Sequence, residues 1–164
     1  MYEKNSEQAF FSFVLLDDYN TRKYIVSKIK EYVFDLKCYD TDIIDFSLKE
    51  FTKNVKERFV IVLNLNSFFE QLSNEKNISV YEAKDLFYQS INMCRDSVFL
   101  KYDATFLMFL NDDDYYHFMD VADDFFSCCQ CRLNINECFF DKDNQSLDEY
   151  YKENHLKKIL RKST

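Results

Sequence analysis

The sequence predicts a three-layer α/β domain, in which a mostly parallel five-stranded sheet lies between two layers of helices. Nearly continuous apolar runs at 9–16, 58–65 and 104–111 are typical of strands that are buried on both faces. Segments with apolar residues at helical spacing separate these runs. Strand and helix alternate five times, which favours parallel pairing through crossover connections.

In the first half of the chain, five elements are expected. They are a strand over 9–16, a helix over 21–34, a short strand over 36–39, a helix over 41–57 and a strand over 58–65. Polar residues that can cap a helix precede the first helical segment. We expect Asn20 or Thr21 to be its N-cap.

The second half of the sequence contains two predicted capping boxes and the remaining helices and strands. Ser79 with Glu82, and Ser146 with Glu149, have the spacing of capping boxes at helix starts. The elements are a short helix or turn over 67–72, a helix from 79, a strand over 104–111, a helix over 112–126, a strand over 129–135 and a helix from 146 to about 160. We expect an α/β domain over 1–140, and a hinge with a basic amphipathic C-terminal helix over 141–164.

The 164 residues include no glycine and no proline. A phosphate-binding loop of the GxxxxGK type, a dinucleotide fingerprint and a nucleophile elbow all need small residues at tight turns. These sites cannot be built here in their standard form. We therefore expect no nucleotide cofactor and no enzymatic activity that depends on such loops.

The net charge and the hydropathy pattern indicate whether the protein should contact nucleic acid or a membrane. The net charge is −8, so the protein as a whole should repel nucleic acid. The N-terminal residues lack a basic segment before an apolar core, and the apolar runs are too short to span a bilayer. We expect a cytoplasmic protein without membrane contact.

Six cysteines are present, and four of them fall within 128–138. Cys128 and Cys131 form one CxxC pair, and Cys138 offers a further thiolate, whereas zinc sites usually have two spaced pairs. We expect buried, unligated thiols, and metal binding by this cluster stays an open alternative. If the segment is extended, Cys129 and Cys131 should lie on one face of the strand.

Polar residues follow three of the predicted strands and should meet at one edge of the sheet. Asp17, Asp112 and Asp114 would be the ligands if the edge held Mg²⁺, as in metal-dependent nucleases or phosphotransferases. The ordinary interpretation is that these residues cap and flank helix N-termini. We favour capping, because no basic or histidine side chain clearly accompanies the carboxylates.

Asp17 and Asp18 also resemble the acidic pair of response-regulator receiver domains. Asn64 or Asn66 stands where the phosphoacceptor aspartate of a receiver would end its third strand. This third interpretation implies a signalling module without a phosphoacceptor. It requires the strand order 2-1-3-4-5, whereas a strand 1 flanked by later strands favours an ATPase-like fold.

The chain also resembles the nucleotide-binding core of the AAA-type ATPases, and most closely the N-terminal domain of clamp-loader delta subunits. Residues 17–23 occupy the Walker A position with Lys23 but no glycine, Asn64 replaces the Walker B acid, and Asn111 closes a sensor-like strand. The resemblance implies a degenerate P-loop topology without ATPase activity, in a DNA replication or other DNA-linked assembly. The hydrophobic wedge of delta has no counterpart at 53–56, so clamp opening is not implied.

Two charged segments suggest docking surfaces. The predicted helix over 112–126 is strongly acidic, and the C-terminal helix is basic with an apolar stripe. The candidate interaction residues are Asp112, Asp113, Asp114, Asp120, Asp123, Asp124, Lys152, Leu156, Lys157, Lys158, Ile159, Leu160 and Arg161. The alternative is two solvated helix faces. His117 and His155 have no accompanying site pattern, so we expect structural roles for them.

These observations favour a non-catalytic protein-interaction module with an inactivated nucleotide-binding fold. The expected partner is another protein or a second copy, and nucleic acid would be contacted only through the basic C-terminal helix. A Mg²⁺-dependent nuclease or phosphotransferase is the alternative of a different class.

Overall fold

A computed structural model describes residues 10–42, 46–47, 49, 51, 56–96 and 104–136. The elements are β1 (Phe10–Leu15), α1 (Tyr19–Lys30), β2 (Leu36–Asp40), β3 (Phe59–Asn64), α3 (Asn66–Lys76), α4 (Val80–Cys94), β4 (Thr105–Leu110), α5 (Asp112–Val121), α6 (Asp123–Phe126) and β5 (Cys129–Asn134). The predicted helix over 41–57 lies mostly outside the described residues. The predicted hinge and C-terminal helix lie wholly outside them.

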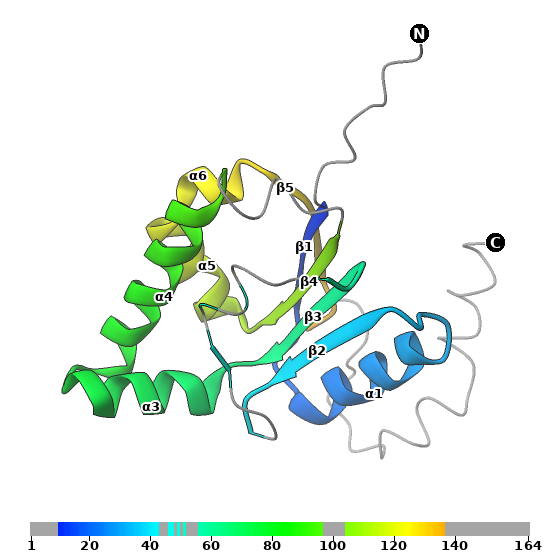
Figure 1. The fold of residues 1–164 in the computed structure, drawn as a ribbon, viewed down its shortest axis with the longest axis horizontal. Coiled ribbons are helices and arrows are strands. Elements are labelled where there is room, and N and C mark those ends of the chain that lie inside the picture. The colour runs from blue at the N-terminus through cyan, green and yellow to red at the C-terminus, as the bar shows by residue number, and fades with distance from the viewer. Residues whose placement is uncertain are drawn as a thin grey trace, which may run out of the picture.

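The five strands form one parallel sheet in the order β2-β3-β4-β1-β5 (Figure 1). The predicted three-layer α/β fold class is therefore confirmed. Strand β1 lies between the later strands β4 and β5. This order differs from the order 2-1-3-4-5 that the receiver-like interpretation requires.

Helices α3, α4, α5 and α6 cover one face of the sheet with an aromatic core (Figure 1). Phe118 lies at its centre, stacked on Tyr88 with ring centroids 4.4 Å apart and edge-on to Phe13 of β1 at 5.7 Å. Aromatic pairs in these geometries add to the stabilisation from burial of their area. Most of the buried phenylalanines thus belong to this core, which is the larger of the two.

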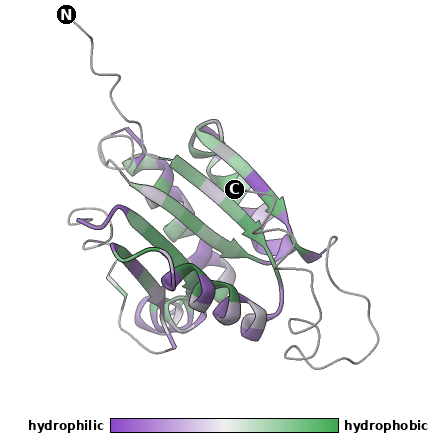
Figure 2. Cartoon of the chain, turned by 90° about the vertical axis from the view of Figure 1, so that its right-hand side faces the viewer, coloured by the Kyte–Doolittle hydropathy of each residue, from purple (hydrophilic) through white to green (hydrophobic). Residues whose placement is uncertain are grey.

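Among the described residues, α1 alone covers the opposite face. Val26 of α1 packs with Val14 and Leu16 from the first strand segment and with Ile61 and Leu63 of β3. Alternate residues of the strands therefore enter different cores, which explains why their apolar runs are continuous. Figure 2 shows the strands coloured mainly as hydrophobic, whereas the helices carry both hydrophobic and hydrophilic residues.

The structure moves the start and end of the first helix from their predicted places. Asp18 is the N-cap, because its Oδ2 accepts hydrogen bonds from the Thr21 backbone N–H at 2.7 Å and the Thr21 hydroxyl at 2.6 Å. The helix ends at Lys30 and not at 34. The predicted caps Asn20 and Thr21 are therefore wrong.

Two further details concern the ends of helices in a chain that has no glycine. Asn77 follows α3 in the left-handed region with φ of 51°, where asparagine is among the few residues that replace glycine. The acidic helix predicted over 112–126 is broken at Ala122, whose φ of −129° is not helical. The chain divides there into α5 and α6.

Candidate functional site

The candidate site lies at the carboxyl edge of the sheet. Because all described strands are parallel, the segments that follow β1, β3 and β4 come to the same edge. Asn111 caps α5 there, and its Oδ1 accepts a hydrogen bond from the Asp114 backbone N–H at 2.6 Å. Asp18 caps α1 in the same way, and Asp112 and Asp114 lie in the first turn of α5, whereas Asp17 is not an N-cap.

Arg22, in the first turn of α1, spans the space between two strand ends. Its Nε donates to the carbonyl of Leu16 at 2.6 Å, and its Nη1 donates to the carbonyl of Leu63 at 3.1 Å. Strand β4 lies between β1 and β3 in the sheet, so the guanidinium bridges strands that are not neighbours. The side chain therefore connects the ends of β1 and β3 at this edge of the sheet.

The guanidinium of Arg22 is buried close to three carboxylates. Burial lowers the pKa of its guanidinium, and the nearby carboxylates of Asp17, Asp114 and Asp18 act in the opposite direction. A metal ion at this point would meet a cation, and a phosphate would meet three carboxylates. Sequence reasoning missed this residue, because a basic residue in a first helical turn usually lies in solvent.

The three proposed metal ligands have separate surroundings. Asp17 exchanges two hydrogen bonds with Asn136, at 3.0 and 3.1 Å, and Asp114 forms an ion pair with Lys84 at 2.5 Å. Asp112 is exposed. Within the described ranges, no group of three or more histidines, cysteines or carboxylates is placed to hold a metal ion.

A second polar cluster forms around Asn64, at the carboxyl end of β3. Asn64 is buried, and its Nδ2 donates to Asp42 Oδ2 at 2.8 Å and to Asp40 Oδ1 at 3.3 Å. Its Oδ1 accepts from the Asn66 backbone N–H at 2.9 Å. The amide thus acts as a donor to two carboxylates, which an aspartate at this position could not do.

Asp40 is a buried carboxylate that receives a further hydrogen bond from Tyr19. The Tyr19 hydroxyl donates to Asp40 Oδ2 at 2.5 Å. Burial, then this hydrogen bond and the negative charge of Asp40, raise the pKa of Tyr19 to about 12. The cluster therefore joins α1, β2 and β3 through neutral donors and two acids.

The acidic helices present a partly neutralised face. Asp114 pairs with Lys84, and Asp124 lies 3.8 Å from Arg95 Nη1. The remaining acidic candidates on these helices are exposed: Asp112, Asp113, Asp120 and Asp123. The basic candidates Lys152, Leu156, Lys157, Lys158, Ile159, Leu160 and Arg161 lie outside the described residues.

His117 joins helices α4 and α5. Its Nε2 lies 2.5 Å from Asp85 Oδ1, and its ring stacks on Tyr81 with centroids 4.0 Å apart. The Tyr88 ring meets the imidazole edge-on at 5.2 Å. These contacts fit the structural role expected for His117, and His155 lies outside the described residues.

The expectation that Cys129 and Cys131 share one face of β5 is wrong. A bulge at residue 130 places Cys129 opposite Phe11 and Cys131 opposite Ser12, which are neighbours on β1 with opposite directions. Cys129 packs against the aromatic core and its pKa is raised by burial, whereas Cys131 is exposed. Cys138 lies outside the described residues, so the metal alternative for the whole cluster stays a prediction.

In the part of the chain that the structure describes, no helix has the length and apolar character needed to cross a membrane. Comparison with known proteins finds no matching family model, no matching curated protein and no matching solved structure.

Proposed function

We propose that this protein is a non-catalytic interaction module that has the framework of a nucleotide-binding fold without its chemistry. The carrying observation is the position of Arg22, whose guanidinium bonds to the ends of β1 and β3. The strand order supports the same proposal, because β1 lies between two later strands as an ATPase-like topology requires. Asn64 supports it further, since its amide is committed to two aspartates.

The proposal follows from what an active site at this edge would need. Phosphoryl transfer requires a divalent cation and donors free to meet the phosphates. Two N–H groups of Arg22 already donate hydrogen bonds to backbone carbonyls. Its positive charge would also repel a metal ion at this edge. Its neighbouring carboxylates oppose a phosphate. Both halves of a Mg-nucleotide complex are therefore disfavoured.

The interaction surface in this proposal is the exposed acidic face of α5 and α6. Asp113 and Asp120 are exposed and have no ion pair among the described residues. A basic partner would gain from complementary charge, and the basic segment after residue 151 offers such charge within the same sequence. The partner is thus a second copy or another protein with a basic surface.

A test combines truncation with matched charge reversals. Truncation after Gln145 should change the melting temperature or the oligomeric mass, because the predicted apolar stripe loses its docking surface. Asp113→Lys with Asp120→Lys should produce the same kind of change in light scattering. Glu70→Lys with Glu75→Lys on α3 is the control with equal charge change. An unchanged mass and melting temperature in the first two variants would contradict the interaction surface.

A DNA-linked assembly is the setting that the AAA-type resemblance adds to this proposal. The net charge of the protein is −8, so contact with nucleic acid would be confined to the basic C-terminal segment. The nuclease or phosphotransferase alternative gains no contact that favours it. Asp17 and Asp114 are engaged with Asn136 and Lys84 respectively.

A further inference from the structure

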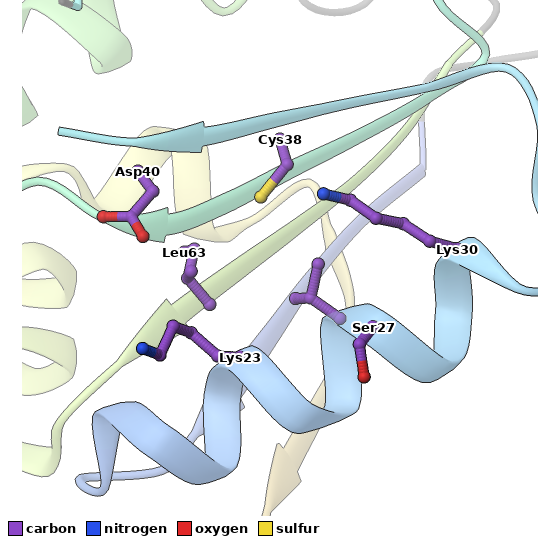
Figure 3. A pocket seen from close by; sticks show the side chains of 7 residues that line it. Lys23, Ser27, Lys30, Cys38, Asp40 and Leu63 are labelled. Carbon is purple, nitrogen blue, oxygen red and sulfur yellow. The ribbon is translucent and has the colours of Figure 1, made fainter. Parts of the chain in front are cut away.

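A cavity of about 350 Å³ lies between α1 and the edge strand β2 (Figure 3). It opens on the face of the sheet where α1 is the covering helix, and Cys38 of β2 remains partly exposed there. Val26 of α1 and Leu63 of β3 give it an apolar lining. Sites for small organic molecules have this size range and combine an apolar lining with a few polar groups.

The polar groups of this cavity are mainly cations from α1. This helix carries four basic residues and no acidic one, although the protein as a whole is acidic. Arg22 is engaged with strand carbonyls, and Lys28 pairs with Glu31 at 2.6 Å. The other two, Lys23 and Lys30, both line the cavity, and neither has a carboxylate partner among the described residues.

The opposite wall does not cancel this charge. Asp40 lines one end of the cavity, but its carboxylate is buried and already accepts hydrogen bonds from Tyr19 and Asn64. Lys30 extends toward Cys38 (Figure 3), and burial raises the pKa of that thiol, so it is uncharged at neutral pH. Two ammonium groups therefore face one carboxylate, which leaves the cavity positive.

We propose that this cavity binds a small amphiphilic anion. Its apolar body would contact Val26 and Leu63, and its carboxylate or phosphate would lie within reach of Lys23 and Lys30. An ammonium group acts as a compact point charge that accepts either head group. Arg22 itself does not line the cavity, so the inference does not depend on the hydrogen bonds that Arg22 makes at the carboxyl edge.

The first test compares four probes with the same eight-carbon body. Octanoate, octyl phosphate, octylammonium and octanol are titrated into the full-length protein by calorimetry at low salt. We expect saturable binding of at least one of the two anions, and at least about tenfold weaker binding of octylammonium and octanol. The tighter of the two anions identifies the preferred head group.

Variants of the helix test the role of the lysines. Lys23→Gln with Lys30→Gln should weaken binding of the anion by about fivefold or more, since two charge interactions are lost. Lys28→Gln is the control for the loss of a lysine from this helix, because it removes one positive charge outside the cavity, and Lys23→Gln and Lys30→Gln as single variants match it in charge. The affinity of the Lys28→Gln variant should remain within about twofold of the parent protein.

Alkylation of Cys38 reports the location of the probe. Bound anion should slow labelling of Cys38 by iodoacetamide, as measured by mass spectrometry of its peptide, and leave the exposed Cys131 unaffected. Three results would overturn the proposal. The first is no saturable binding of either anion at roughly millimolar concentration, and the second is equal binding of octylammonium. The third is binding that leaves Cys38 labelling unchanged. Equal weakening in the Lys28 variant would likewise overturn it.

Discussion

Replacement of Asn64 by aspartate is the sharpest test of the polar cluster behind the carboxyl edge. The change replaces the side-chain amide by a carboxylate, with almost no change in shape. In the structure, the Asn64 amide donates to Asp42 and Asp40 at 2.8 and 3.3 Å. A carboxylate would lose both hydrogen bonds and place an oxygen against two other carboxylates.

The magnitude follows from these contacts. A hydrogen bond to a charged group contributes about 1.5–3 kcal/mol, and loss of the stronger one with added charge repulsion gives about 3–5 kcal/mol. With a typical urea slope of about 2 kcal/mol per molar, the unfolding midpoint should fall by about 2 M. Circular dichroism during urea unfolding measures this shift.

Asn66→Asp is the matched control, because Asn66 is exposed and lies two residues along the same segment. It should change the midpoint by less than about 0.5 M. Protonation of the introduced carboxyl at residue 64 removes the repulsion, so its deficit relative to the control should shrink as the pH falls from about 7 to about 4. Equal stability of the two variants at neutral pH would refute the hydrogen bonds assigned to Asn64.

Two further predictions concern α1. Asp18→Ala should lower the free energy of unfolding by about 1 kcal/mol, because α1 loses its N-cap. In the same urea titrations, the control Asp113→Ala should leave the free energy of unfolding nearly unchanged. Equal effects of the two substitutions would contradict the assignment of Asp18 as the N-cap. The pKa of Tyr19 is raised to about 12 in the folded state, so its neutral form contributes stability that is fully present below its ordinary value near 10 and is lost as the pH rises toward 12. The stability advantage of the parent protein over Tyr19→Phe should therefore decrease across this alkaline range, and a constant difference would contradict the hydrogen bond to Asp40.

The sheet could be predicted from the sequence because its strands are buried on both faces. Leu15 and Leu16 enter different cores, so the strand segment lacks polar alternation and stands out from the helices. The start of α4 could also be predicted, because its capping box depends only on local sequence spacing. The Ser79 backbone N–H donates to Glu82 at 2.8 Å, and the Glu82 N–H donates to the Ser79 hydroxyl at 3.2 Å.

The details of the site depend on contacts between distant residues. Arg22 reaches the carbonyl of Leu63, and local periodicity contains no signal for that contact. The partners of Asn64 likewise come from β2 and its following turn. The bulge at residue 130 changed the face of Cys131, because a shift of one residue reverses the direction of each side chain. Such features arise from strand pairing and packing.

Titration calorimetry with Mg-ATP tests the central claim most directly. The claim is that Arg22 and its surrounding carboxylates leave no place for a metal–nucleotide complex at the carboxyl edge. We predict no saturable heat with micromolar nucleotide and the full-length protein. Saturable binding that is lost when Arg22 is replaced by alanine, in a variant that still unfolds cooperatively, would show that the guanidinium serves a nucleotide and would contradict the account.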